Sequence, residues 1–189
     1  MAAMRIFTGI QLSEEAREKI VKELDPFRRI APSIRWTGKE NIHLTLKFIG
    51  EVEPGLSGKI AAALATAKFP LPPFRLRCRG FGKFPPGDDL HIFWAGVEDD
   101  PRLLSLFHAI EALLLPLGVA CETRPFQPHL TLGRNTSRAD FRRLFELLGE
   151  KKDLFLAECP LAAFQLFRSD LTPAGPVYSI IKEIPLAAA

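Results

Sequence analysis

Hydrophobic and polar positions follow two different spacings along the chain, which predicts a mixed α and β structure. Segments in which apolar residues alternate with polar ones, or run together over a few positions, predict strands. Segments with apolar residues three and four positions apart predict amphipathic helices. The predicted strands are Arg5–Leu12, Asn41–Glu51, Phe74–Phe84, Leu90–Val97, His129–Leu132, Leu161–Leu171 and Gly175–Ile184, and the predicted helices are Glu14–Arg29, Pro54–Phe69, Pro101–Leu117 and Ser137–Leu148.

Two of the predicted strands contain the same four residues, His-Leu-Thr-Leu. The copies are His43–Leu46 and His129–Leu132, about half a chain length apart. Each lies in a similar β-α-β-β order of predicted elements, and no low-complexity linker separates the halves. We therefore expect residues 1–189 to form a single domain built as two similar lobes.

Alternation in an extended strand gives each copy a polar face and an apolar face. His43 and Thr45 point one way while the two leucines point the other way, and the second copy behaves in the same manner. Histidine has an unperturbed pKa of about 6.5, which allows proton transfer near neutrality. If both copies face one groove, one imidazole can take a proton from water while the other protonates a leaving oxygen.

Other interpretations of the repeat remain open. A lone histidine in a strand is usually structural, and a duplicated strand can keep its leucines for packing alone. A zinc site usually needs three or four protein ligands, whereas neither histidine has a carboxylate or cysteine at ligand-like spacing. The sequence contains no Gly-x-Ser-x-Gly motif, which is the pattern that would indicate a serine nucleophile. His91 and His108 lack a threonine two positions later, so we expect both to be structural.

The composition sets limits on the ligand and the fold. With 47% hydrophobic residues the chain can fill a core, and its 16 prolines suit strand ends and turns better than a helical bundle. The net charge of +3 suits an anionic ligand but lacks the basic excess of proteins that coat nucleic acid. We therefore expect any RNA contact to be local, at a terminus.

Cysteine usage and the apolar runs bear on location and partners. The cysteines Cys78, Cys121 and Cys159 are odd in number and widely spaced, which favours neither a disulfide framework nor a zinc site. No export signal and no apolar run of about 20 residues is apparent. We expect a cytoplasmic protein that acts as a monomer, with no membrane and no obligate protein partner.

With these residues in view, the chain resembles the RNA 2′,3′-cyclic phosphodiesterases of bacteria and archaea. They were formerly described as 2′-5′ RNA ligases and belong to the two-histidine phosphoesterase superfamily. The resemblance covers nearly the whole chain, through MRIFTGIQL, RWTGKENIHLTLKFIGEV, FGKFP, WAGVEDDP, RPFQPHLTLGR and FRSDLTPAGPVYSII.

The resemblance implies a fold and an activity. The fold would be a bilobal α+β structure, with two antiparallel sheets related by pseudo-two-fold symmetry around a central groove and helices on the outside. The activity would be hydrolysis of 2′,3′-cyclic phosphate ends of RNA or small cyclic nucleotides to 2′-phosphomonoesters, without metal or other cofactor.

The resemblance also implies roles for individual residues. His43 would be the proton donor to the departing O3′, and His129 would be the proton acceptor that activates water. Thr45 and Thr131 would hold phosphate oxygens, and Arg134 would neutralise phosphate charge. Alternation places Arg134 on the face opposite His129, so its role requires a bend or bulge after Gly133, which a glycine makes feasible.

Four further side chains are weaker candidates for substrate contact. Lys47 follows His43 by four residues, so a regular strand would place both on the same face. Lys47 then either adds positive charge to the groove or is an ordinary surface lysine. Phe48 falls on the leucine face, which favours the core over a base-stacking role. Trp36 and Phe126 could stack on a terminal base, although ordinary packing is the more common use of such residues.

Two other functions fit the same sequence. One is the reverse reaction, a 2′-5′ RNA ligase activity that joins tRNA halves with the same two histidines. The other is a non-catalytic module that binds RNA ends or nucleotides, which would have no reason to keep both histidines and both threonines.

Overall fold

The computed structural model describes residues 3–85, 91–135, 142–173 and 175–186. The strands are β1 (Met4–Gln11), β2 (Arg35–Trp36), β3 (His43–Val52), β4 (Phe74–Phe84), β5 (Ile92–Val97), β6 (His129–Arg134), β7 (Phe155–Leu161), β8 (Ala163–Thr172) and β9 (Gly175–Pro185). The helices are α1 (Glu14–Ile30), α2 (Pro54–Thr66), α3 (Pro101–Leu114) and α4 (Arg142–Glu150), with short 3-10 turns η1 (Lys39–Asn41) and η2 (Leu115–Leu117).

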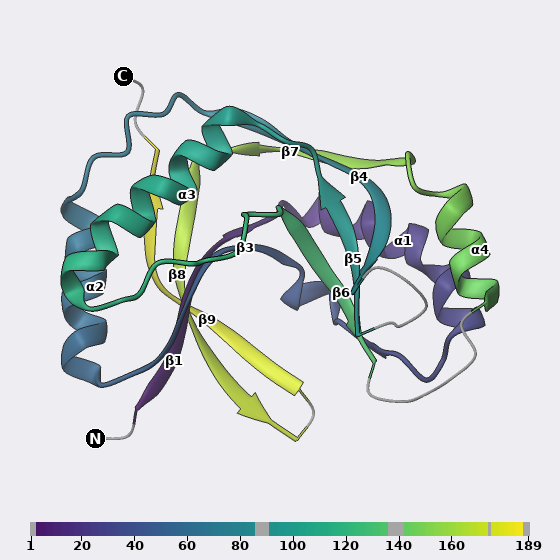
Figure 1. Cartoon of the computed structure of the whole chain (residues 1–189), viewed down its shortest axis with the longest axis horizontal. Helices are drawn as coiled ribbons and strands as arrows, with labels where there is room; N and C mark the ends of the chain where they lie inside the picture. The colour runs from purple at the N-terminus through teal and green to yellow at the C-terminus, as the bar shows by residue number, and fades with distance from the viewer. Residues whose placement is uncertain (1–2, 86–90, 136–141, 174, 187–189) are drawn as a thin grey trace.

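The strands form one antiparallel sheet that curves strongly (Figure 1). Its order is β7-β4-β5-β6-β3-β1-β8-β9, and β2 pairs with β6 beside this path. The order divides into two groups of four strands, and the innermost strand of each group, β6 or β3, carries one copy of the repeat. β3 and β6 are joined by the pair Leu44–Leu130. The two sheets that the resemblance implied are therefore continuous through this pair.

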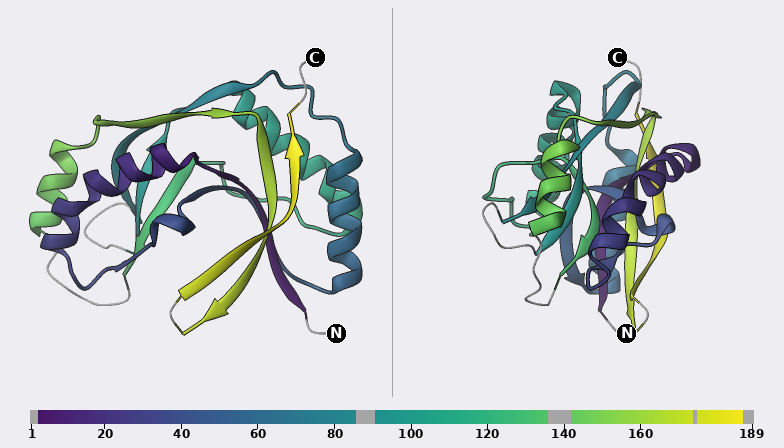
Figure 2. Two further views of the ribbon diagram at one scale, coloured as in Figure 1. Left: turned by 180° about the vertical axis from the view of Figure 1, so that it is seen from behind. Right: turned by 90° about the vertical axis from the view of Figure 1, so that its right-hand side faces the viewer.

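The helices cover the outside of the curved sheet, as the α+β fold class predicted. α1 packs against β7 and α4, while α2 and α3 pack together near β9 and β3 (Figures 1 and 2). α1 begins after Ser13, whose side chain accepts a hydrogen bond from the Ala16 N–H, as expected of an N-cap. No helix in the described ranges is long and apolar enough to cross a membrane.

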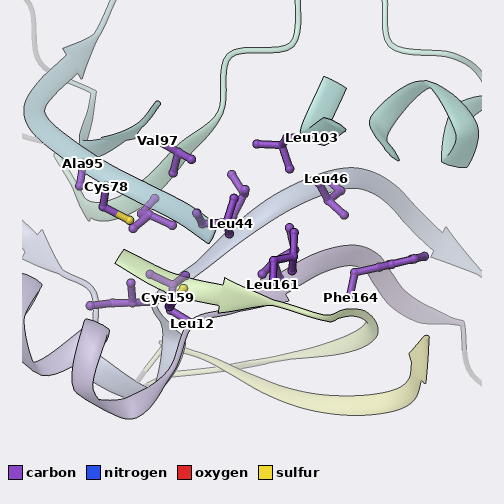
Figure 3. Packing of buried hydrophobic residues seen from close by; sticks show 14 of the residues in the cluster. Leu12, Leu44, Leu46, Cys78, Ala95, Val97, Leu103, Cys159, Leu161 and Phe164 are labelled. Carbon is purple, nitrogen blue, oxygen red and sulfur yellow. The ribbon is translucent and has the colours of Figure 1, made fainter. Parts of the chain in front are cut away.

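The leucines of both repeats are buried in the core. Leu44, Leu130 and Leu132 are fully inaccessible and Leu46 is 3% exposed. Figure 3 shows Leu44 and Leu46 among the core side chains contributed by neighbouring strands. The prediction that the leucines anchor the two strands is therefore confirmed. Each histidine is the first residue of its strand, directly before a buried leucine.

Most predicted elements are present, but β2 and β7 were missed. β7 contains Glu158 and Pro160, which are poor strand formers, yet it lies at the edge of the sheet, where proline is tolerated. α3 ends at Leu114 and gives way to a 3-10 turn that contains Pro116. The start of the predicted helix Ser137–Leu148 and of the predicted strand at Leu90 lies outside the described residues.

Candidate active site

The two histidines flank the one residue pair that joins the halves of the sheet. Because Leu44 pairs with Leu130 and both leucines point into the core, His43 and His129 project from the opposite face. They are close enough to interact electrostatically, since a positive charge on His129 lowers the pKa of His43. The structure thus brings together the two copies of the repeat, as the sequence predicted.

Each imidazole is oriented by a backbone carbonyl two residues earlier. Nδ1 of His43 lies 2.7 Å from the carbonyl oxygen of Asn41, and Nδ1 of His129 lies 2.7 Å from that of Gln127. A carbonyl oxygen only accepts, so each Nδ1 must carry a proton and donate it. In the neutral ring Nε2 is then the basic nitrogen, and in the protonated ring Nε2–H is the available acid. Both rings therefore offer Nε2 for proton transfer.

The threonine of the first repeat completes this arrangement. Oγ1 of Thr45 lies 3.1 Å from Nε2 of His43, so the hydroxyl can donate to the neutral ring or accept from the protonated one. Thr131 lies two residues after His129 on β6 and is half-buried. Each histidine therefore has a hydroxyl beside it on the same strand face.

The environment of His43 favours the neutral form of the ring. Phe7 and Tyr178 lie with their ring centroids 4.8 and 5.0 Å from that of His43, and Phe167 lies at 6.0 Å. Burial lowers the pKa of His43 below its ordinary value, and positive charge on His129 and Arg134 acts in the same direction. The hydrogen bond to Asn41 opposes these effects without overcoming them.

His129 has different neighbours. Phe84 lies edge-on to it at 5.2 Å between centroids, and Trp94 lies at 6.5 Å. The two halves of the site therefore share a backbone plan but surround their imidazoles with different aromatic groups.

A glycine on β1 allows the first repeat to sit where it does. A Cβ atom on Gly9 would lie 2.7 Å from the carbonyl oxygen of Leu44 and 3.5 Å from Cδ2 of His43. Gly9 pairs with Thr45 in register, so the close approach of β1 occurs at the first repeat itself. Sequence reasoning missed this residue, although glycine inside a predicted strand is a signal of close backbone approach.

Both repeats contain an extra residue at the same position, the second leucine. On β3, Thr45 and Lys47 pair with consecutive residues of β1, which leaves Leu46 as a bulge. On β6, Thr131 and Gly133 pair with consecutive residues of β5, which leaves Leu132 as a bulge. A bulge inverts the alternation of the side chains that follow it.

The bulge at Leu132 turns Arg134 to the face that carries His129. Burial raises the pKa of Tyr178, and the positive charge of Arg134 opposes that rise; the same charge adds to the burial that lowers the pKa of His43, so the guanidinium lies near both groups. The bend that Arg134 requires is therefore present, but it precedes Gly133 rather than following it. Gly133 itself is needed for packing, because a Cβ atom there would lie 2.7 Å from Cγ2 of Ile34.

The equivalent bulge at Leu46 overturns the predictions for Lys47 and Phe48. Lys47 faces the core and is 6% exposed, where it pairs with Glu111 at 2.5 Å and donates to the Ala120 carbonyl at 2.6 Å. Phe48 is instead on the histidine face, 50% exposed, with the Arg5 guanidinium 4.7 Å from its ring centroid. Simple alternation failed because it assumed a regular strand.

Trp36 and Phe126 pack against the core, as the simpler interpretation had it. The Trp36 indole donates to the Ala31 carbonyl at 3.2 Å. Phe126 stacks on Phe107 at 4.5 Å between centroids. His91 precedes β5 and His108 lies on α3, so neither belongs to the repeats.

Asn41 and Tyr178 are site residues that sequence reasoning did not single out. The Asn41 carbonyl accepts from His43, and its side-chain amide donates to the Pro176 carbonyl on β9 at 2.9 Å. That second bond holds β9, and with it Tyr178, against His43. The pairing could not be foreseen because Asn41 and Pro176 are far apart in the sequence.

The side chains at the site decide whether it could hold a metal ion. Within the ranges that the structure describes, no three side chains of histidine, cysteine, aspartate or glutamate converge to hold one. The polar groups that do converge are two imidazoles, hydroxyls and a guanidinium, a set suited to proton transfer and to an anion.

Comparison with known proteins places this geometry in a family. The model of the 2′-5′ RNA ligase superfamily matches residues 15–173. Proteins named RNA 2′,3′-cyclic phosphodiesterase from Thermotoga maritima and Methanocaldococcus jannaschii are each 32% identical over 180 residues. The match covers 95% of this chain in both cases, and 94% and 99% of those proteins.

Solved structures agree with the sequence relatives. A crystal structure from Thermus thermophilus matches with a TM-score of 0.76 at 29% identity, over 98% of this chain and 99% of that one. The apo structure of Escherichia coli LigT has the same fold, with a TM-score of 0.79 at 24% identity over 98% and 99% of the two chains. The chain therefore belongs to the 2′-5′ RNA ligase superfamily.

Proposed function

We propose that this protein hydrolyses 2′,3′-cyclic phosphate ends of RNA or nucleotides to 2′-phosphomonoesters. The observation that carries the proposal is the pair of histidines on one face, each fixed by a carbonyl so that Nε2 is the working nitrogen. The names of the relatives from Thermotoga maritima and Methanocaldococcus jannaschii support the same activity.

The proposed reaction is an in-line displacement at phosphorus. Nε2 of His129 removes a proton from water while the water oxygen bonds to phosphorus. The bond from phosphorus to O3′ breaks, and Nε2–H of His43 gives its proton to O3′. The product keeps the phosphate on O2′, and the two imidazoles return to their starting states by exchanging protons with solvent.

Charge that develops on the phosphate needs positive or hydrogen-bonding partners. In the proposed complex the hydroxyls of Thr45 and Thr131 hold the non-bridging oxygens, and Arg134 neutralises their charge. The same anion favours the protonated form of His43. Substrate binding therefore favours protonation of His43, the proposed acid, whose pKa is lowered by burial.

Phosphorus NMR of a 2′,3′-cyclic nucleotide incubated with the protein tests the activity and its direction together. We expect the cyclic phosphate signal to be replaced by that of the 2′-phosphomonoester alone. Since both proton transfers are assigned to histidines, we expect the same rate in the presence of EDTA. Formation of the 3′-phosphomonoester alone would show that His43 and His129 do not act in the proposed order.

A further inference from the structure

A cavity adjoins His43 on the side of β9. Its volume is about 230 Å³, and Ile42, Phe167, Tyr178 and Ile180 form its apolar walls. This space suits a single flat ring system better than a whole nucleotide. A small cavity that combines apolar side chains with a few polar groups is a common form of small-molecule subsite.

Two polar side chains, Gln11 and Glu40, line the same cavity. Gln11 pairs with His43 in register, and Glu40 belongs to the 3-10 turn just before β3. Neither the Gln11 amide nor the Glu40 carboxylate has a side-chain hydrogen-bond or ion-pair partner within the part of the chain that the structure describes. Both groups are therefore available to a ligand.

The position of Tyr178 connects the cavity with the reacting groups. Its ring lies edge-on to His43, and the Arg134 charge acts on its hydroxyl. A nucleotide whose phosphate lies between the histidines can thus reach the cavity with the base of the same residue.

We propose that this cavity holds the nucleobase of the terminal residue and that it selects guanine. A carboxylate only accepts hydrogen bonds, and guanine presents two adjacent donors, N1–H and the 2-amino group. The neighbouring O6 of guanine is an acceptor, which the Gln11 amide can satisfy. Adenine and cytosine offer one amino group beside an acceptor nitrogen, and uracil offers one N–H between two carbonyls. Each of these bases leaves an acceptor facing the Glu40 carboxylate.

The guanine pocket rests on the proposed function for its choice of substrate. Two measurements distinguish a failure of the pocket from a failure of the proposed function. Hydrolysis rates of the 2′,3′-cyclic phosphates of guanosine, adenosine, cytidine and uridine give the selectivity. We expect kcat/KM to be at least about tenfold higher for guanosine, the discrimination typical of a bidentate contact. Affinities of the four nucleoside 2′-monophosphates, measured calorimetrically, give the same comparison without turnover.

Glu40→Gln tests the carboxylate itself. The variant replaces one acceptor oxygen with a donor, so we expect the ratio of the guanosine rate to the uridine rate to fall by about tenfold. Remaining turnover of the uridine substrate shows that the variant is folded, and Glu146→Gln, on the exposed side of α4, should keep the wild-type ratio.

The outcomes are distinct. Equal hydrolysis of all four cyclic nucleotides overturns the guanine pocket and leaves the proposed function standing. If none is hydrolysed, the proposed function fails, and the affinities alone decide the inference: preference for guanosine 2′-monophosphate supports it, and equal affinities overturn it. A guanosine preference that persists unchanged in Glu40→Gln also overturns it.

Discussion

Phe48 and Arg134 occupy equivalent positions in the two repeats, each two residues after the leucine that forms a bulge. Both side chains consequently lie on the face that carries the histidines. The first repeat places an exposed aromatic ring there and the second places a guanidinium. The same position of the duplicated backbone therefore carries an aromatic ring in the first repeat and a cation in the second.

Arg134→Ala is expected to lower kcat/KM for a cyclic nucleotide by about 10²–10³-fold, because it removes a donor that stabilises charge in the transition state. Arg134→Lys should recover part of the loss, since lysine keeps the charge but not the bidentate geometry. Arg143→Ala, on the exposed surface of α4, is the matched control and should retain the full rate. A rate for Arg134→Ala within a factor of two of the wild type would remove Arg134 from the site.

His43→Ala and His129→Ala are each expected to reduce turnover by about 100-fold or more, the usual contribution of a positioned acid or base. If the two histidines act in one concerted step, the rate loss in the double variant should be far smaller than the product of the two single losses. His91→Ala and His108→Ala remove histidines outside the repeats and should leave the rate unchanged. Steady-state rates with one cyclic nucleotide suffice for this comparison.

The sequence predicted both repeats, the buried leucines and most of the elements that carry them. These features were predictable because the alternation of apolar residues in a strand and the repetition of a rare histidine are both visible in short segments of sequence. The face of Lys47, Phe48 and Arg134 was not predictable in the same way, since a bulge depends on how two strands pair. Likewise, Gly9 and Asn41 act through contacts with distant segments. Local pattern therefore identified the two histidines of the candidate site, and tertiary pairing decided what surrounds them.

The pKa of His43 should reflect the burial of its side chain. We expect its pKa to lie below the ordinary value of about 6.5, and Arg134→Gln to raise it, since removing a positive neighbour favours the protonated ring. Inorganic phosphate should raise it as well. Histidine ring signals followed by NMR over pH measure these shifts, and a downward shift in Arg134→Gln would contradict the assigned proximity.

The same pKa has a consequence for stability. The folded protein holds His43 neutral where the unfolded chain binds a proton, so the unfolded state binds more protons between the lowered pKa and about 6.5. Stability should therefore fall as the pH decreases through this window. Denaturant unfolding at a series of pH values measures the slope, which should be smaller in His43→Ala.

The buried pair Lys47–Glu111 is expected to matter for folding rather than for turnover. Their side chains are 7% and 9% exposed, so Lys47→Met should destabilise the fold by about 3–5 kcal/mol by leaving the carboxylate unpaired. The double variant Lys47→Met with Glu111→Leu should recover most of that loss, because no buried charge then remains. Denaturant unfolding measures both changes. A double variant no more stable than the single one would show that the pair is not the source of the effect.

Gly9→Ala tests whether the close approach of β1 positions the first repeat. The added methyl group would meet the Leu44 carbonyl at 2.7 Å, and backbone on a central strand cannot move aside without displacing His43. We expect a loss of about 1–3 kcal/mol in stability, the usual cost of overpacking, together with reduced turnover at temperatures where the variant is folded. Gly58→Ala is the matched control, because no atom lies within 4 Å of a Cβ there and the residue is inside α2. That variant should gain up to about 1 kcal/mol from helix propensity and keep its rate. If Gly9→Ala lost stability but kept full turnover, the glycine would serve packing of β1 against β3 and not the placement of His43.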